Sequence, residues 1–365
     1  MIPPGSTIGI LGGGQLGRML AIAAAQLGYR CHIYAPEASG PATEVAAEWT
    51  QAGYFDAEAM NKFAASVAVV TYEFENIHPK AVASLAGMVP VHPSPRSLDV
   101  SGYRPSEKQC VQQLGGETAP YREVDGLAAL DKAIGEVGLP AILKTTQFGY
   151  DGKGQARIHA SEDAAGAWDT LSKTPAAWQT PAAAPAILEG MVDFIAEFSV
   201  ILCRGEDGVS VVWDTPENIH KDGILDRSLV PARAEIIEQA PRAIEIARAV
   251  ADQLGHVGIL TLEFFATRDG PVFNEMAPRV HNSGHWTIEG SLTSQFENHI
   301  RAICGLPLGS TERVGTRVEM QNLIGPQADD WASILADPAA HLHLYGKGHS
   351  RPGRKMGHVT RLFFA

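Results

Sequence analysis

Two glutamates sit on the two strands of a predicted hairpin. Residues 258–265 and 271–276 are largely apolar, and a hairpin centred on Asp269 places Glu263 opposite Glu275. Opposed side chains share one face with Cβ atoms about 5 Å apart, where two like charges destabilise each other. A divalent cation would relieve this repulsion, and ligands that are all oxygen favour Mg²⁺. The hairpin therefore predicts a magnesium site; a single carboxyl of raised pKa, or a different register, is the alternative.

A lysine and a glycine-rich loop lie earlier in the chain. Lys144 ends the apolar run 141–144, and residues 147–155 read QFGYDGKGQ. Three glycines in six residues favour a mobile flap that brings Lys153 onto phosphate oxygens, while Lys144 reaches them from a fixed strand. An ordinary hairpin turn is the alternative for the loop alone. Together with the acidic hairpin, the two lysines predict that a nucleoside triphosphate is neutralised here.

A second glycine-rich segment, residues 12–17 (GGGQLG), follows the first predicted strand and opens a helix. Small residues at such a turn let backbone N–H groups approach a phosphate. The pattern is compatible with a dinucleotide-binding oxidoreductase, with Glu37 as the ribose acid. It is equally compatible with a small-anion site or a purely structural turn.

The elements that must position these groups fall into three units. Residues 1–100 alternate strands and helices, which predicts a parallel sheet covered by helices, and Pro93-Ser94-Pro95 is typical of a linker. Residues 101–305 contain strands that follow one another directly, which predicts an α+β domain with antiparallel pairing; its lid spans about 118–192. Residues 306–365 form a third, smaller unit. The fold class is therefore α/β followed by α+β.

Composition excludes several classes of protein. The 365 residues carry a formal net charge of −12, which argues against general affinity for nucleic acid or anionic membranes. No uncharged run reaches the length of about 18 residues that a membrane span needs. The four cysteines form no CxxC pair, which fits reduced thiols rather than zinc or disulfides. We therefore expect a soluble cytoplasmic protein that binds neither nucleic acid nor membranes.

The last part of the chain reverses the overall charge. Residues 341–365 contain Lys347, Arg351, Arg354, Lys355 and Arg361 and no acidic residue. A solvated basic surface and a site for an anionic group are both compatible with this pattern.

Seven motifs in order along the chain resemble the N5-carboxyaminoimidazole ribonucleotide synthase family of the ATP-grasp superfamily. They are GGGQLGRM (12–19), YEFENI (72–77), GYDGKGQ (149–155), ENIHKDGIL (217–225), NEMAPRVHNSGHWT (274–287), SQF (294–296) and RKMGH (354–358). The resemblance covers residues 1 to about 360. It implies a biotin-carboxylase-like N-terminal domain, an ATP-grasp fold whose two lobes hold ATP between them, and a small C-terminal domain.

The resemblance also implies residue roles in binding Mg-ATP. Glu189 would meet the adenine amino group, the Met191-Val192 backbone would read the ring edge, Glu197 would bind the ribose, and Glu263 and Glu275 would hold Mg²⁺. The other implied ATP contacts are Arg104, Lys144, Gly149, Tyr150, Asp151, Gly152, Lys153, Gly154, Gln155, His220, Asn274 and Glu275. In a regular strand Asn274 points away from the face of Glu275, so its contact requires a twist or a bulge.

For the second substrate, aminoimidazole ribonucleotide, the resemblance implies a separate set of ligands. Lys347 and Arg354, with Arg351 beside them, would bind its 5′-phosphate. The remaining contacts would come from Glu73, Tyr150, Asp151, Asn282, Ser283 and His285. Bicarbonate would attack the γ-phosphorus of ATP to give carboxyphosphate, which Arg279 would hold. The exocyclic amine of the ribonucleotide would then capture carboxyphosphate, or the carbon dioxide released from it. Lys144 and Lys153 would stabilise the transferring phosphoryl group.

Three departures and two rivals accompany this interpretation. Tyr103 stands where the family usually has an acidic residue, Phe148 where a glycine is common, and Ala277 where many other grasp enzymes have Asn. Another ATP-grasp ligase, such as a formate-dependent transformylase or a biotin carboxylase, would share the nucleotide site but use a different acceptor. A nicotinamide-dependent oxidoreductase would explain only the first glycine loop. The family also suggests a homodimer.

Overall fold

The computed structural model describes residues 1–147, 154–173 and 185–364. The chain begins with a parallel sheet of order β3-β2-β1-β4. Its strands are β1 (Thr7–Leu11), β2 (Arg30–Ala35), β3 (Glu48–Gln51) and β4 (Val69–Tyr72), with helices α1 (Gln15–Gln26), α2 (Ala57–Ser66), α3 (Pro79–Ala86) and α4 (Pro95–Ser101). The predicted strand at 89–91 is only a single bridge between Val70 and Val91. The predicted βαβ alternation is confirmed. The strands β1, β2 and β4 are largely apolar and buried, as expected of a parallel sheet covered on both faces, whereas the edge strand β3 is mostly exposed.

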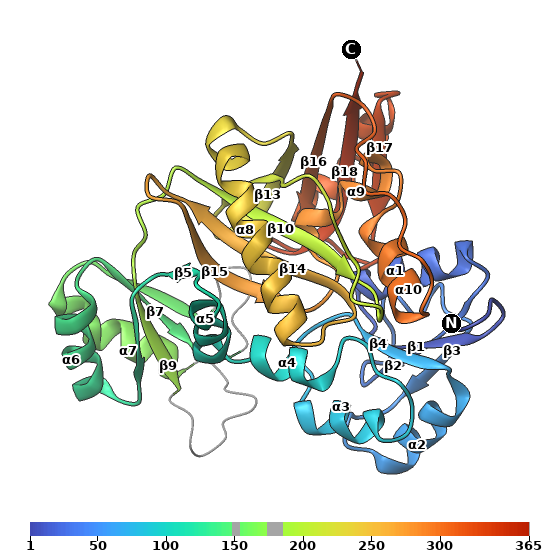
Figure 1. Ribbon diagram of the computed structural model, residues 1–365, viewed down its shortest axis with the longest axis horizontal. Coiled ribbons are helices and arrows are strands. Elements are labelled where there is room, and N and C mark those ends of the chain that lie inside the picture. The colour runs from blue at the N-terminus through green and yellow to red at the C-terminus, as the bar shows by residue number, and fades with distance from the viewer. Residues whose placement is uncertain (148–153, 174–184, 365) are drawn as a thin grey trace.

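A larger, mainly antiparallel sheet forms the centre of the molecule (Figure 1), with the strand order β17-β18-β16-β13-β12-β10-β14-β15-β5 and with β11 beside β10. Its strands are β5 (Glu117–Thr118), β10 (Ala196–Arg204), β11 (Ser210–Val212), β12 (Glu217–Lys221), β13 (Ile224–Val230), β14 (Gly258–Ala266), β15 (Pro271–Ala277), β16 (Arg317–Ile324), β17 (Ala340–Leu344) and β18 (Lys355–Phe363). Only β5 joins this sheet in parallel, against β15.

Helices cover the centre of this sheet. The helix α8 (Ala234–Gln253) packs Ile246 and Val250 against Val200 and Leu260 of the strands below it. Beside it lies α5 (Arg104–Gln113), which contacts β15, while α9 (Thr287–Gly290) and α10 (Gln295–Ile303) follow the carboxylate hairpin in sequence. The helix α8 is amphipathic, which explains how one apolar stripe fixes it on the strands.

A third, four-stranded sheet lies to one side (Figure 1) and has the order β6-β9-β7-β8. Its elements are β6 (Tyr121–Val124), α6 (Leu127–Val137), β7 (Ala141–Thr145), β8 (Gln155–Ile158), α7 (Ala164–Ser172) and β9 (Ala186–Gly190). Its own apolar core includes Leu130, Leu143, Ile158 and Leu188. The sheet is therefore a small lobe whose strand β7 carries Lys144.

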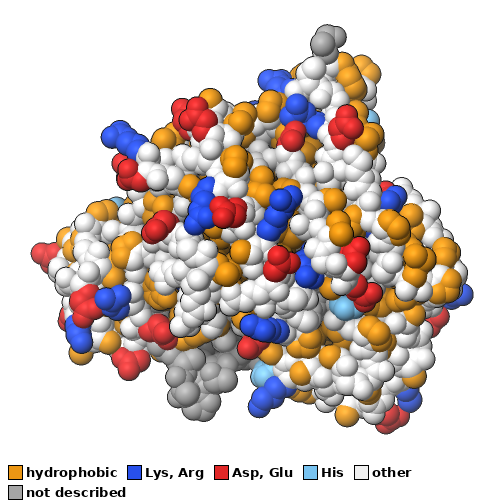
Figure 2. Space-filling view, in the orientation of Figure 1, with side chains coloured by type: hydrophobic (Ala, Val, Ile, Leu, Met, Phe, Trp, Pro, Cys, Tyr) orange, Lys and Arg blue, Asp and Glu red, His pale blue; other side chains and the backbone are white. Residues whose placement is uncertain are grey.

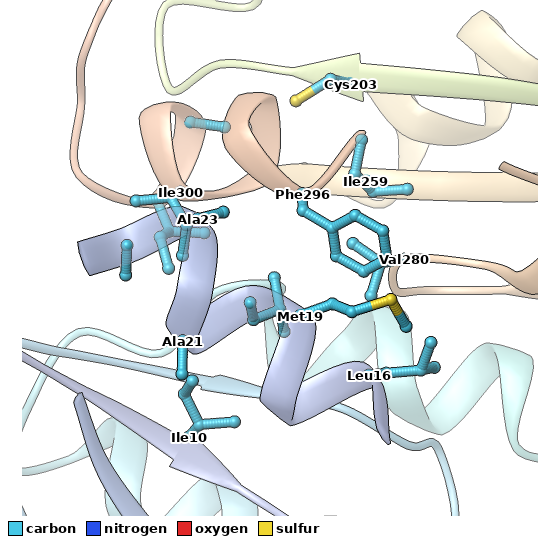
Figure 3. Packing of buried hydrophobic residues seen from close by; sticks show 14 of the residues in the cluster. Ile10, Leu16, Met19, Ala21, Ala23, Cys203, Ile259, Val280, Phe296 and Ile300 are labelled. Carbon is cyan, nitrogen blue, oxygen red and sulfur yellow. The ribbon is translucent and has the colours of Figure 1, made fainter. Parts of the chain in front are cut away.

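One apolar core joins the first sheet to the central sheet. Met19 of α1 lies beside Phe296 of α10, and Val280 and Ile259 lie on the other side of that ring (Figure 3). Burying each such side chain contributes about 1.5–3 kcal/mol. The two sheets are thus fixed relative to one another by packing as well as by the chain.

The last segment does not build a sheet of its own. The strand β16 pairs with β13, and β18 and β17 follow it outward, with the short helix α11 (Trp331–Leu335) packed beside β17. The predicted third unit is therefore an extension of the central sheet, and the domain boundaries stay predictions.

Acidic and basic side chains are interspersed on the face shown in Figure 2, with no broad area of one sign. Within the described ranges, no helix combines the length and the apolarity that crossing a membrane would require.

Candidate active site

A cavity of about 1340 Å³ opens where the three sheets approach one another. It is lined from the first sheet by Glu73, from the small lobe by Lys144, from the central sheet by Glu263 and from the segment before β18 by Arg354. The cavity gathers seventeen of the predicted site residues. They are Glu73, Arg104, Lys144, Gln155, Glu189, Met191, Val192, Glu197, His220, Glu263, Asn274, Glu275, Arg279, Asn282, Lys347, Arg351 and Arg354.

The structure describes the predicted flap only at its two ends. Gly149, Tyr150, Asp151, Gly152 and Lys153 lie outside the described residues. Gly154, at the end of the loop, has φ +69°. Its carbonyl accepts a hydrogen bond from the Thr145 N–H at 2.8 Å, which joins the end of the loop to β7.

The two hairpin glutamates face each other as the register predicts. Glu263 of β14 is the cross-strand partner of Glu275 of β15. His281 Nε2 lies 3.0 Å from Glu263 Oε1, and Arg104 Nη1 donates to Glu275 Oε2 at 2.9 Å. Burial alone would raise the pKa of Glu263, but the imidazole of His281 beside it lowers that pKa. Two carboxylates thus share one wall of the cavity, and each lies beside a nitrogen-bearing side chain.

A β-bulge lies next to this pair and changes the direction of one side chain. Between the turn and the bulge, Phe264 pairs with Phe273, so the register centred on Asp269 is wrong by one residue there and holds again at the glutamates. Asn274 is the extra residue, and it lines the cavity together with Glu275. The bulge therefore supplies what the predicted contact of Asn274 required.

The donors at this wall fit a magnesium ion. Besides the two carboxylates, the Oδ1 atom of Asn274 is buried and has no hydrogen-bond partner among the described residues. Mg²⁺ prefers such oxygen ligands, one or two of them carboxylates, with the rest from water and substrate phosphates. Glu263, Glu275 and Asn274 are thus able to hold the ion.

Buried lysines hold Glu189 at the opposite end of the nucleotide region. Lys144 Nζ donates to Glu189 Oε2 at 2.9 Å, and Lys108 Nζ lies 3.3 Å from the same oxygen. Burial raises the pKa of Glu189, but the two lysines outweigh it and hold the pKa at about 2. The other oxygen, Oε1, has no partner in the described part of the chain, so it remains an acceptor for an amino group.

The segment after β9 provides the predicted ring-edge contacts only in part. The Met191 N–H donates to the Pro140 carbonyl at 3.0 Å, so this donor is used inside the protein. Val192 also lines the cavity, and Phe194 stacks on Phe265 with ring centroids 4.7 Å apart. The backbone polar groups that can face a ring edge are therefore the Met191 carbonyl and the Val192 N–H.

Glu197 forms an ion pair with a histidine in the same region. His220 Nδ1 lies 3.2 Å from Glu197 Oε1. Burial lowers the pKa of His220, but the neighbouring carboxylate of Glu197 more than offsets this, so that the pKa is raised. Both side chains line the cavity, as the predicted ribose and ATP contacts require.

Arg279 is held by an acid that sequence reasoning missed. Its guanidinium makes two hydrogen bonds to the Glu75 carboxylate, one of them from Nη2 to Oε1 at 2.7 Å. Burial would raise the pKa of Glu75, but Arg279 lowers it. Glu75 belongs to the YEFENI motif, and its position two residues after Glu73 was the signal that could have indicated it.

The first glycine loop is occupied by a side chain of the protein itself. The Glu73 carboxylate accepts hydrogen bonds from the Gly14 N–H and, at 2.7 Å, from the Gly17 N–H at the start of α1. A Cβ on Gly12 would lie 2.5 Å from Glu73 Cγ, so glycine is required for this approach. The loop amides that a dinucleotide phosphate would need are thus used by Glu73, against the oxidoreductase alternative.

Basic side chains gather at the other end of the cavity. Arg354 Nη1 donates to the Lys347 carbonyl at 3.2 Å, and Lys347 Nζ donates to the Lys355 carbonyl at 2.8 Å. Arg351 lines the same end, and Asn282 lies nearby, bonded to Asn322. This end of the cavity is therefore suited to an anionic group.

Two predicted substrate ligands lie elsewhere. Ser283 and His285 are buried and do not line the cavity. Ser283 Oγ bonds to Ser199 Oγ at 2.7 Å, and His285 stacks among Phe296, Tyr345 and His358. The structure therefore does not bring these two residues to the cavity, and their contact with substrate stays a prediction. Gln295 holds the loop that carries both residues, through hydrogen bonds to the N–H and the carbonyl of His281.

Three family models match successive parts of the chain. Residues 5–102 match the ribonucleotide synthetase preATP-grasp domain, residues 109–296 the ATP-grasp domain, and residues 319–363 the phosphoribosylaminoimidazole carboxylase C-terminal domain. The first sheet lies within the first match and the small lobe within the second, while the central sheet extends from the second match into the third.

Relatives and solved structures extend the match to the whole chain. N5-carboxyaminoimidazole ribonucleotide synthase of Brucella melitensis is 48% identical, with 99% of this chain and 97% of the relative covered; that of Bacillus subtilis is 42% identical, with 99% and 92% covered. The enzyme of Aspergillus clavatus in complex with ADP and aminoimidazole ribonucleotide superposes with a TM-score of 0.88 at 30% identity, covering 98% and 93%.

An ADP complex of an N5-carboxyaminoimidazole ribonucleotide synthetase gives a TM-score of 0.92 at 41% identity, covering 99% of this chain and 93% of that one. The order of the matched domains and the extent of these matches argue against another ATP-grasp ligase with a different acceptor. The chain belongs to the N5-carboxyaminoimidazole ribonucleotide synthase family and is an ATP-dependent ligase of purine biosynthesis with the ATP-grasp fold.

Proposed function

We propose that the cavity carboxylates the exocyclic amine of 5-aminoimidazole ribonucleotide, using ATP and bicarbonate, and that the residues described above divide this work. The observation that carries the proposal is the pair Glu263 and Glu275, which face each other across two strands and line the same cavity as Lys144 of the small lobe and Arg354 of the basic end. A nucleotide and a ribonucleotide can thus meet end to end at the acidic wall.

The nucleotide would lie along the side of the cavity that carries Lys144 and Glu197. Glu189 Oε1 offers an acceptor to the adenine amino group, and the Val192 N–H and Met191 carbonyl can pair with the ring edge. His220, Arg104 and Gln155 complete this half. Glu263, Glu275 and Asn274 would hold Mg²⁺, which when bound neutralises charge on the triphosphate oxygens.

The chemistry begins with bicarbonate, whose carbon is a poor electrophile because an anionic oxygen deactivates it. A bicarbonate oxygen forms a bond to the γ-phosphorus of ATP while the bond to the β-phosphate oxygen breaks, giving carboxyphosphate and ADP. The amine then forms a bond to the carboxyl carbon as phosphate departs and the amine loses a proton. Carbon dioxide released from carboxyphosphate would react at the same nitrogen.

Three cationic side chains are assigned to the phosphoryl transfer and to the mixed anhydride that it forms. Lys144 stands on a strand within reach of the phosphates, and Lys153 of the flap is assigned the same task. Arg279 is fixed by Glu75 at the cavity wall, where its guanidinium can bind the oxygens of the mixed anhydride. Closure of the flap with Tyr150 and Asp151 over the ribonucleotide would exclude water, which otherwise hydrolyses carboxyphosphate.

The basic end of the cavity is assigned to the second substrate. Lys347, Arg351 and Arg354 would bind the 5′-phosphate, and an arginine is suited to phosphate because it can donate two parallel hydrogen bonds. Glu73 and Asn282 would face the ribose and aminoimidazole. With its 5′-phosphate held at the basic end, the ribonucleotide would extend toward the acidic wall and present its amine there.

The test is the dependence of phosphate release on each substrate. With ATP present, release should require both aminoimidazole ribonucleotide and bicarbonate, and the product should decompose to the starting ribonucleotide in acid. Release that continues at the full rate without the ribonucleotide would contradict the proposal.

We further infer a cytoplasmic homodimer. The four cysteines, Cys31, Cys110, Cys203 and Cys304, are buried and unpaired, which fits a reducing compartment. Light scattering should give twice the 38.9 kDa of one chain, and a mass of one chain would contradict the dimer.

A further inference from the structure

Helix α5 brings two adjacent charged residues into the interior beside the acidic wall. The side chains of Glu107 and Lys108 are 2% and 0% exposed. Burying charges in this way costs free energy unless each is paired and hydrogen-bonded. Neither residue belongs to the nucleotide contacts assigned above, so their partners must explain why they are there.

Lys108 connects the two ends of the nucleotide region. Its Nζ donates to the Asn274 carbonyl at 3.1 Å and lies 3.3 Å from Glu189 Oε2. Asn274 is the bulged residue of β15 and has no partner in the ladder with β14. Lys108 therefore supplies a donor at the point where the irregular strand loses its regular pairing.

Glu107 holds the same strand on the other side of Glu275. Its Oε2 accepts a hydrogen bond from the Met276 N–H at 2.9 Å. Its Oε1 lies 3.9 Å from Nη1 of Arg104, the arginine that contacts Glu275. The peptide groups before and after Glu275 are thus each fixed by one residue of α5.

We propose that Glu107 and Lys108 are positioning residues that hold the bulged backbone around Glu275, and so aim the oxygens of Asn274 and Glu275 at the metal bound by the nucleotide. Neither is assigned a contact with substrate, although Glu107 borders the cavity. The inference rests on the proposed function, because it concerns the metal end of the same site. Groups that orient metal ligands typically change metal affinity about 10- to 100-fold when they are removed.

The experiment measures ADP binding by calorimetry with and without Mg²⁺. The ratio of the two dissociation constants reports the gain in affinity that the metal provides. In Lys108→Met and Glu107→Met this gain should fall about 10-fold or more. Glu107→Gln, which keeps an acceptor for the Met276 N–H, should retain a gain close to that of the wild type. The KM for the ribonucleotide should not change in any of the three.

Glu217→Gln is the matched control. Glu217 is a buried acid on β12 of the same sheet, paired with Arg233 and absent from the cavity lining. A merely structural role would lower the melting temperature of the control and of the methionine variants alike and leave the metal-dependent gain intact. Wild-type gain in Lys108→Met and Glu107→Met would overturn the proposal.

If Lys108→Met does not fold, Glu107→Met alone gives the test, because it removes the acceptor of the Met276 N–H. A gain about 10-fold or more below that of the wild type is then expected, and an unchanged gain counts against the positioning role. The binding ratio does not depend on turnover. Failure of the ribonucleotide requirement in phosphate release would therefore refute the proposed function while leaving this measurement valid.

Discussion

Each glutamate of the acidic wall has a cationic neighbour from a different element. His281 lies against Glu263, and Arg104 lies against Glu275. These neighbours offset the repulsion of two carboxylates on adjacent strands, which by itself would destabilise the hairpin. The wall can therefore hold two carboxylates close together, as a metal site that uses both of them requires.

Glu275→Gln should abolish most of the turnover. The amide cannot supply the second negative ligand, so charge on the transferring phosphoryl group is less well stabilised, and kcat should fall at least about 100-fold. Because the side chain is 37% exposed, the melting temperature should change little. Phosphate release and thermal melting measure the two effects. Asp269→Asn in the exposed turn is the control, and a wild-type kcat in Glu275→Gln would refute the metal role.

Glu75→Gln should weaken the use of bicarbonate. A neutral amide cannot make two charge-assisted hydrogen bonds to Arg279, so the guanidinium loses its fixed direction. A misplacement of about 1 Å costs roughly 100-fold, and kcat/KM for bicarbonate should fall by about 10- to 100-fold. Steady-state kinetics with varied bicarbonate measure this. Glu58→Gln, at an exposed pair with Lys62, is the control; equal bicarbonate kinetics in both variants would exclude the role of Glu75.

At the scale of elements, the carboxylate hairpin shows what a local pattern can predict. Glu263 and Glu275 follow from the two apolar runs and the turn between them. The bulge does not, because no residue type in 271–277 marks an extra position. The sequence alone therefore does not predict which way the Asn274 side chain points.

Helix α5 shows where a local pattern is insufficient. Its sequence, RPSEKQCVQQ, has the composition of a solvated helix, so Glu107 and Lys108 were not singled out. Their burial depends on β15, which is more than 160 residues away in sequence. Ser283 and His285 are the converse, since polar residues in a motif were expected at the cavity and pack behind it.

Gly270→Ala should separate stability from activity in the hairpin. Gly270 has φ +130°, which a residue with a Cβ adopts at a cost of about 1–2 kcal/mol, and no atom lies within 4 Å of that Cβ position. The free energy of unfolding should fall by this amount in urea denaturation, while kcat stays at the wild-type value. Gly126→Ala, in open space without a positive φ, is the control. A large loss of kcat would mean that the turn and the glutamates move together.

At the scale of the whole molecule, the sequence does not predict which strands pair when they lie far apart along the chain. The strand order within the first sheet follows from its βαβ pattern, and the two ends of the carboxylate hairpin are close in sequence. The pairing of β13 with β16 joins residues about 90 positions apart, and no local pattern indicates it. For this reason residues 306–365 were predicted as a separate small unit although their strands continue the central sheet.

Two buried histidines join the first unit to the central sheet and should make stability depend on pH. His256 contacts Ser97 and the Ile259 carbonyl, and His299 contacts Thr71 and the Ile259 N–H. Burial lowers the pKa of His256 to about 4 and that of His299 to about 3. In the unfolded chain both histidines take up a proton as the pH falls below their ordinary pKa of 6.5, whereas in the folded protein they stay neutral there.

Stability should therefore be complete above pH 6.5 and be lost as the pH falls toward 4. Each histidine should contribute a loss of about 2 kcal/mol between pH 7 and pH 5. Urea denaturation at the two pH values measures this loss, and His256→Asn should reduce it. A loss that is the same in this variant and in the wild type would show that His256 does not titrate as described.

The cavity takes its walls from distant parts of the chain, and this has a consequence for synthesis on the ribosome. Lys144, Glu189 and the acidic hairpin are made well before residues 347–355, which β16 and β18 hold in place. A growing chain thus acquires the means to grip a nucleotide before it can recognise the second substrate. Cleavage between β15 and β16 should leave an N-terminal fragment that binds ATP but does not carry out the ligase reaction.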